Sequence, residues 1–299
     1  MDIEKLTLEQ ALERHKEGTL VGVFLMSNDD YHRSPGISKS TLDKVHVSPA
    51  TYRHTILNPE PPTSAMEFGS ALHTGILEPG EFDKRYAIAG PELDRRGTKA
   101  WQAFEAENPG KVLLKDEEGS KIEQMIKVAR KHSRATLLDG MKEIAFFCKH
   151  PETGLVLKCK VDVLTAKGVI TDYKASAMSV YPERRWASVC YRLRYHVGAA
   201  FYLDVVLHAL DQSGKNGMFP KIPSAFVLFA QEKDAPFLVK PWAVGEQSIL
   251  LGRREYEADL KLIKECDEKQ AWPGYPEKIE VVELPEYAWK DELEEVGNE

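Results

Sequence analysis

The chain has 299 residues, and its 42% hydrophobic content is enough to bury a substantial core. It carries 40 Lys and Arg residues against 47 Asp and Glu residues, which gives a formal net charge of −7. That balance excludes a protein that coats nucleic acid by bulk positive charge, so any contact with DNA must come from a local basic patch.

The cysteines and the N-terminal residues indicate the cellular setting. Residues 1–18 form a charged, helix-like stretch rather than a signal peptide, and no run approaches the ~20 apolar residues of a membrane span. We therefore expect a cytoplasmic protein with no membrane contact. The cysteines lack the CxxC spacing of zinc and iron–sulfur sites and are expected to be free, buried side chains: Cys148, Cys159, Cys190 and Cys266.

The N-terminal half is predicted to be largely helical. Apolar residues recur over 65–79 and no helix breaker occurs before Pro79, so this segment is expected to be a buried helix that contains His73. A serine cap at Ser38 or Ser40 and the proline at Pro49 mark the starts of two further helices. The other expected elements are helices over 6–16, 101–107 and 117–132 and a strand over 20–26.

The middle of the chain changes to a strand pattern. Segments 143–150, 155–164 and 169–175 are short, rich in Val, Ile and Phe, and separated by PETG and TAKG turns, which predicts three consecutive antiparallel strands. The elements expected after them are a helix over 181–210, a hairpin of 224–231 and 236–244, and a charged helix over 246–269. This order favours a mixed α/β architecture, with a single domain over 1–289 and an acidic tail over 290–299.

Two aspartates and a lysine in the last two strands of this meander form the most informative pattern. In a hairpin closed at TAKG, Asp162 and Asp172 lie opposite or nearly opposite each other, with side chains roughly 5 Å apart if they share a face. Lys174 follows Asp172 by two residues, so both side chains point to the same face of the strand. Because they lie at a strand end, we expect both side chains to face solvent. Two carboxylates suit a hard cation such as magnesium, which would polarise a phosphoryl oxygen. Lys174 would orient or help deprotonate the attacking water and offset charge on the phosphorus oxygens.

The alternative without a catalytic role is a pair of strand-end or turn aspartates that form ion pairs with Lys158, Lys160 or Lys174. An Asp-x-Lys triplet alone carries no information, because the same triplet occurs at Asp259 and again at Asp267 in a charged helical stretch. The strand context distinguishes the case, since aspartate is depleted within strands.

Four segments together resemble the PD-(D/E)XK nucleases, most closely the exonuclease VIII-like (RecE-type) branch that includes lambda exonuclease. They are FGSALH (68–73), KCKVDVL (158–164), TDYKAS (171–176) and RYHVGAAFYLD (194–204). The resemblance implies a restriction-endonuclease-like core, in which a central mixed sheet is flanked by helices. It also implies a site whose catalytic residues are His73, Asp162, Asp172 and Lys174, and whose metal-binding residues are His73, Asp162, Asp172 and Tyr173.

The fourth segment departs from the family pattern. The family presents a glutamine four residues before a tyrosine; the tyrosine matches Tyr202, but Gly198 occupies the glutamine position. His196 or Tyr195 is a neighbouring candidate to replace the glutamine; otherwise that DNA contact is absent. The substitution therefore affects the expected affinity for DNA and the processivity, whereas catalysis by the metal site need not be lost.

Two further residues have competing interpretations. A histidine in an apolar helix is more often a core residue than a ligand, and only the GSALH context and the downstream Asp-x-Lys favour a metal role for His73. Imidazole is an unusual magnesium ligand, which makes manganese an alternative cofactor. Glu143 is a second possible ligand, but a plain strand-edge glutamate is the preferred interpretation, and we leave it out of the site.

The candidates for DNA contact are basic residues and helix caps. Arg184 and Arg185 are expected at the start of a helix, where a phosphate is favoured. Ser38, Ser40 and Tyr202 join them, as does Arg194. Solvated helix faces are an equally good interpretation of the full basic set, which is Lys39, Arg53, Arg95, Arg96, Lys99, Arg184, Arg185, Arg192 and Arg194.

These observations favour a magnesium-dependent exodeoxyribonuclease that degrades one strand of linear duplex DNA in phage or prophage recombination within a bacterial cell. The 5′-to-3′ polarity is implied only by the family resemblance. The resemblance implies a ring-shaped homo-oligomer around DNA and a single-strand annealing protein as partner, and a ring would confine positive potential to its channel. The alternatives are a structure-specific or nicking endonuclease of the same fold, and a catalytically weak DNA-binding recombination protein. Closed circular DNA separates the first two, because an exonuclease needs an end.

Overall fold

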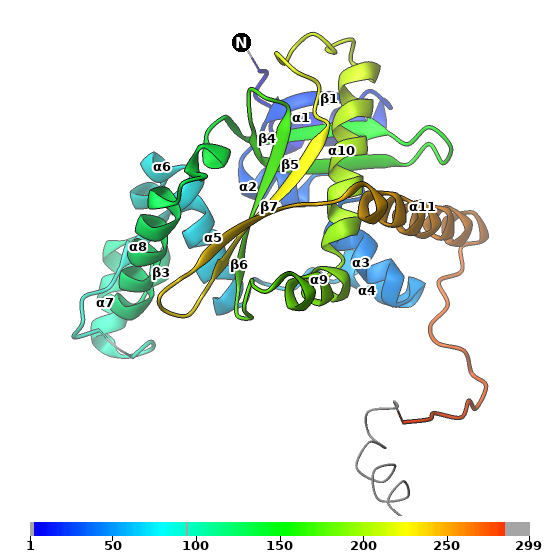
Figure 1. The fold of residues 1–299 in the computed structure, drawn as a ribbon. Helices are drawn as coiled ribbons and strands as arrows, with labels where there is room; N and C mark the ends of the chain where they lie inside the picture. Colours follow the sequence, from blue (N-terminus) through cyan, green and yellow to red (C-terminus); the bar gives the residue numbers. More distant parts are fainter. Residues whose placement is uncertain (1–2, 94, 285–299) are drawn as a thin grey trace, which may run out of the picture.

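A six-stranded mixed sheet forms the centre of the molecule, as Figure 1 shows for the computed structural model, which describes residues 3–93 and 95–284. The strand order is β1-β4-β5-β6-β7-β8; β6 and β7 run parallel and the other neighbours antiparallel. The strands are β1 (Gly22–Leu25), β4 (Met141–Lys149), β5 (Val156–Leu164), β6 (Val169–Ser176), β7 (Ala225–Glu232) and β8 (Val239–Ala243). The predicted mixed α/β class and the β4-β5-β6 meander are confirmed.

Helices cover both faces of the sheet. They are α1 (Leu8–Lys16), α2 (Asn28–Arg33), α3 (Lys39–Val47), α4 (Pro49–Leu57), α5 (Ser64–Leu77), α6 (Pro79–Arg85), α7 (Lys99–Glu107), α8 (Asp116–Lys131), α9 (Glu183–Arg192), α10 (Tyr195–Gln212) and α11 (Glu246–Lys269), with a short 3₁₀ turn at Ala135–Leu138. The sequence did not predict α2, α6 or the small parallel sheet of β2 (Tyr86–Ile88) and β3 (Val112–Leu114). The expected acidic tail at 290–299 lies outside the described residues.

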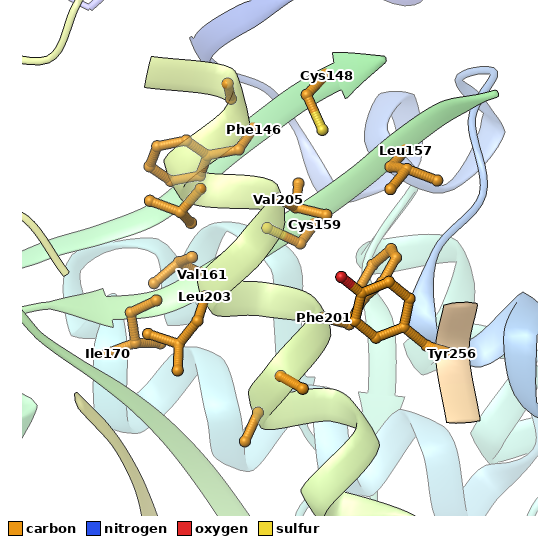
Figure 2. Packing of buried hydrophobic residues seen from close by; sticks show 14 of the residues in the cluster. Phe146, Cys148, Leu157, Cys159, Val161, Ile170, Phe201, Leu203, Val205 and Tyr256 are labelled. Carbon is orange, nitrogen blue, oxygen red and sulfur yellow. The ribbon is translucent and has the colours of Figure 1, made fainter. Parts of the chain in front are cut away.

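One face of the sheet packs against α10. Figure 2 shows Phe146, Val161 and Ile170 of the strands directed toward Phe201 and Val205 of this helix. These side chains are at most 1% exposed, which makes α10 the main hydrophobic cover of this face. Removing a buried phenylalanine ring from such a core typically costs about 3–5 kcal/mol of folding free energy.

The other face packs against α5 and α8. Leu72 and Ile76 of α5 and Ile122 of α8 form a second buried cluster with Val163 and Tyr173 of the sheet. Because α5 lies directly against β5 and β6, the helix brings His73 to the strands that carry the predicted acidic residues. The buried helix predicted around His73 is therefore confirmed.

The segment predicted as one helix over 181–210 is two helices. Arg194 adopts a left-handed conformation with φ 51°, which a continuous right-handed helix cannot contain. The chain therefore turns between α9 and α10, and the two helices form the crossover that lets β7 run parallel to β6.

Strands β5 and β6 diverge where the two aspartates lie. Their pairing includes Leu164 with Ile170 and Val163 with Thr171, and the same register would place Asp162 opposite Asp172. The ladder ends before that pair, while β6 stays paired with β7 through Ser176. The backbone N–H of Tyr173 instead donates to Asp162 Oδ2 at 2.8 Å. The Asp162 carboxylate thus accepts a hydrogen bond from the β6 backbone where β5 and β6 no longer pair. The site forms at this separation of the two strands.

Among the described residues, no helix is both long and apolar enough to span a membrane. All four cysteines are free thiols, as expected, and three of them are buried.

Candidate metal centre and catalytic cavity

His73 lies between two carboxylates. Its Nε2 is 2.9 Å from Asp162 Oδ2, and its Nδ1 is 3.4 Å from Glu143 Oε1. The imidazole is one-quarter exposed, whereas both carboxylates are almost completely buried. Helix α5, β4 and β5 therefore each contribute one metal-ligating side chain to the same point.

Glu143 is the residue of this site that the sequence interpretation left out. It has a positive φ of 56°, which interrupts the regular alternation of β4 between Lys142 and Ile144. Its carboxylate forms an ion pair with Lys160, with Oε2 2.9 Å from Lys160 Nζ, and faces His73. The preferred interpretation of Glu143 as a plain strand-edge glutamate is therefore wrong, because the side chain is buried and turned toward the histidine.

The three side chains fit a divalent cation by size and by chemistry. Among the described residues, ligand atoms of His73, Glu143 and Asp162 all lie within 4.8 Å of one another. Opposite ligands of an octahedral magnesium ion lie about 4.2 Å apart, at twice its usual ligand distance. Two largely buried carboxylates and one imidazole therefore form a group that approaches these dimensions, and the imidazole favours manganese over magnesium.

The charges of this group support the same conclusion. Burial lowers the pKa of His73, but Asp162 and Glu143 outweigh that effect and raise it to about 9. Burial raises the pKa of Asp162, but the histidine and Lys174 outweigh it and bring the value below its usual range. Burial raises the pKa of Glu143 despite the opposing effects of His73 and Lys160. Without a metal, a proton on His73 supplies the positive charge that holds the carboxylates together.

Asp172 and Lys174 point into a small cavity next to this group. Lys174 Nζ lies 2.7 Å from Asp172 Oδ2, and both residues line a cavity of about 60 Å³. Burial raises the pKa of Asp172 above its usual range although Lys174 opposes this effect. Burial lowers the pKa of Lys174, but the carboxylates of Asp172 and Asp162 outweigh burial and raise it. Lys174 is about one-third exposed, whereas Asp172 is buried. The expectation that both side chains face solvent is therefore wrong for Asp172.

The ion-pair alternative for the aspartates is met only in part. Asp172 pairs with Lys174, but the other two lysines point elsewhere: Lys158 donates to the carbonyls of Tyr31 and Ser34, and Lys160 pairs with Glu143. The partner of Asp162 is an imidazole rather than a surface lysine.

Tyr173 has its side chain on the opposite face from Asp172 and Lys174. Its ring belongs to the cluster under α5 and α8, and its hydroxyl donates to Gln231 Oε1 at 2.6 Å. A metal-binding role for Tyr173 is therefore restricted to its main-chain carbonyl oxygen.

Comparison with known proteins identifies the family. The family described as a PDDEXK-like domain of unknown function matches residues 38–285. The chain belongs to this family. It is thereby a member of the PD-(D/E)XK superfamily, whose nucleases use divalent metals. The RecE-type branch is a finer assignment that this match does not make.

A solved structure shares the fold. The crystal structure of a "Putative exonuclease" from Eubacterium rectale aligns with a TM-score of 0.57 over 95% of this chain and 97% of that chain, at 14% sequence identity. No curated protein matches the sequence. The family supports a hydrolytic nuclease that acts on DNA, and the structural likeness supports the PD-(D/E)XK fold.

The DNA-contact candidates of this PDDEXK-like chain differ in accessibility. Arg184 and Arg185 are exposed in the first turn of α9, where a phosphate could approach. Ser38 caps α3, and its hydroxyl lies 2.9 Å from that of Ser40. Arg194 is 8% exposed and donates to Asp259 Oδ2 at 2.7 Å. That placement gives Arg194 a structural role and leaves it no open path to a phosphate.

The fourth family segment reaches the same cavity from α10. Gly198 and Tyr202 both line the cavity that contains Asp172 and Lys174. His196, a proposed replacement for the missing glutamine, is buried against Glu255 of α11 at 3.2 Å. Tyr195, the other proposed replacement, does line the cavity, with its ring centroid 5.5 Å from Lys174 Nζ.

Proposed function

We propose that this chain is a divalent-metal-dependent exodeoxyribonuclease that hydrolyses phosphodiester bonds in one strand of linear duplex DNA. The observation that carries the proposal is the meeting of His73, Glu143 and Asp162 at the point where β5 and β6 part, next to the Asp172–Lys174 pair. Metal ligands next to a cation suit metal-assisted hydrolysis of a phosphodiester.

The metal site would be formed by His73, Glu143 and Asp162, with Asp172 at its border. When bound there, magnesium or manganese supplies Lewis-acid polarisation of a phosphoryl oxygen and lowers the pKa of a water molecule. Magnesium is the proposed physiological ion, and the imidazole ligand predicts higher affinity for manganese.

Lys174 acts as a cation in this proposal. Burial lowers the pKa of Lys174, but Asp172 and Asp162 outweigh burial and raise it above its ordinary value. The ammonium group therefore keeps its proton, orients the attacking water and offsets charge that develops on the phosphorus oxygens. In hydrolysis the water gives up a proton and its oxygen bonds to phosphorus, while the bond to the leaving sugar oxygen breaks and that oxygen takes up a proton.

The finer parts of the proposal come from the resemblance to the exonuclease VIII-like branch. They are 5′-to-3′ polarity, a ring-shaped homo-oligomer that encloses the DNA, a single-strand annealing protein as partner, and a place in phage recombination in the bacterial cytoplasm. A ring would reconcile the net charge of −7 with DNA binding, because it would confine the positive potential to the channel. The free thiols suit a reducing compartment.

The test uses duplex DNA labelled at either the 5′ or the 3′ end, incubated with magnesium, manganese or a chelator. The proposal predicts metal-dependent release of nucleotides from linear duplex, loss of activity in Asp172→Asn and Lys174→Met, and no cleavage of covalently closed plasmid. Nicking of closed plasmid would instead establish the endonuclease alternative. Activity that persists with chelator, or in either variant, would refute the assignment of the site.

A further inference from the structure

We propose that Lys39 is a second cation of the catalytic cavity and binds a non-bridging oxygen of the scissile phosphate opposite Lys174; this inference rests on the proposed nuclease function. Lys39 is the first residue of α3, more than 100 positions before β4 in the sequence. It nevertheless lines the same cavity as Asp172 and Lys174.

The two ammonium groups lie near the same aromatic ring. Lys174 Nζ lies 5.5 Å from the ring centroid of Tyr195, and Lys39 Nζ lies 6.0 Å from the same centroid. Two cations and one aspartate are the charged side chains that line this cavity in the described part of the chain, so the lining carries a net positive charge. A cavity of that composition favours an anionic oxygen.

Two hydrogen bonds hold the Lys39 ammonium group in place and leave it one further donor. Its Nζ donates to Asp43 Oδ2 at 2.7 Å and to the carbonyl of Leu193 at 3.0 Å. An ammonium group has three N–H donors, so one remains for a ligand. Asp43 and the end of α9 therefore fix the position of the amine with respect to the cavity.

The ion pair with Asp43 supports α3, but the helix dipole does not favour a cation at this position. A lysine at the N-terminus of a helix opposes the helix dipole, and the first turn of α3 contains no acidic residue. The side chain is only 19% exposed, and burial lowers the pKa of Lys39 even though Asp43 acts in the opposite direction. A buried cation at the positive end of a helix is costly, which is expected where the charge serves a ligand.

Gly198 provides the space that Lys39 uses. A Cβ atom at position 198 would lie 3.7 Å from both Cγ and Cε of Lys39, so the lysine stem lies along α10 at the residue without a side chain. A long side chain at position 198 would compete for this volume. The structure thus offers a reason why glycine stands where the nuclease resemblance expects glutamine: a cation from α3 fills the gap.

The experiment compares Lys39→Met, Lys39→Arg and the matched control Lys44→Met, an exposed lysine on the same helix. Cleavage of end-labelled linear duplex gives kcat and KM, and thermal melting reports folding. We expect Lys39→Met to lower kcat about 100-fold with KM changed less than threefold, because the lost contact is to the reacting phosphate. Lys39→Arg should retain at least a tenth of the wild-type kcat, and Lys44→Met should match the wild type.

Two results would overturn the inference. One is a Lys39→Met protein with kcat within threefold of the wild type. The other is an equal loss of kcat in Lys39→Met and Lys39→Arg with an equal drop in melting temperature, which would show that Lys39 only ties α3 to α9. Failure of the proposed function is distinguishable, because the wild type would then cleave no duplex or Asp172→Asn would cleave it normally.

Discussion

Metal binding should expel a proton from His73. Asp162 and Glu143 outweigh the effect of burial and raise the pKa of His73 to about 9 in the metal-free protein. At pH 7 the imidazole is therefore about 99% protonated, and only its neutral form ligates a metal. Two pH units correspond to about 2.7 kcal/mol, so apparent metal affinity should be about 100-fold lower at pH 7 than above pH 9.

Titration calorimetry measures this proton directly. Manganese is titrated into the wild type and into His73→Gln at pH 7, in two buffers with different ionisation enthalpies. The dependence of the apparent enthalpy on the buffer gives the number of protons released, and we expect the wild type to release about one more proton than the variant. Equal release from both proteins, or a wild-type affinity that stays constant between pH 7 and 9, would refute the reasoning.

Three further predictions concern charge and burial. The protonated His73 contributes its full stabilisation to the metal-free protein below pH 6.5. The free energy of unfolding in chelator should therefore fall by up to about 3 kcal/mol as the pH rises from 6.5 through 9. Urea denaturation of the wild type and of His73→Gln tests this. Asp172→Asn should lower the rate of cleavage at least 1000-fold, on the order of losing one essential catalytic group. The variant should melt within a few degrees of the wild type, because burial already opposes the aspartate charge. Parallel activity and melting measurements test both expectations. Arg194→Ala should cost about 3 kcal/mol in urea denaturation, because it leaves the buried Asp259 with only the half-exposed His46 as a partner. Arg184→Ala should unfold like the wild type and lower the salt dependence of DNA binding by about one ion.

The sequence predicted the catalytic strands well because their information is local. Alternation of apolar residues and two tight turns specify the β4-β5-β6 meander, and the strand period of two brings Asp172 and Lys174 to one cavity. The placement of His73 beside Asp162 required the family resemblance, since no local pattern connects α5 to β5.

The features that the sequence interpretation missed depend on tertiary contacts. Glu143 lies in the site and has a positive φ within β4. Such a backbone conformation cannot be predicted from the residue type at a non-glycine position. The break at Arg194 occurs within a continuous apolar pattern, and its ion pair with Asp259 of α11 accompanies the turn. Helical periodicity alone could therefore predict neither the crossover nor the loss of Arg194 as a DNA contact.

The most direct test of the account is anomalous diffraction from a crystal of the protein soaked in manganese. One strong peak is expected within about 2.5 Å of side-chain atoms of His73, Glu143 and Asp162, and no peak is expected there in a crystal of His73→Gln soaked at the same concentration. A wild-type crystal without a peak at these three residues, or with the peak unchanged in the variant, would contradict the claim that they form the metal centre.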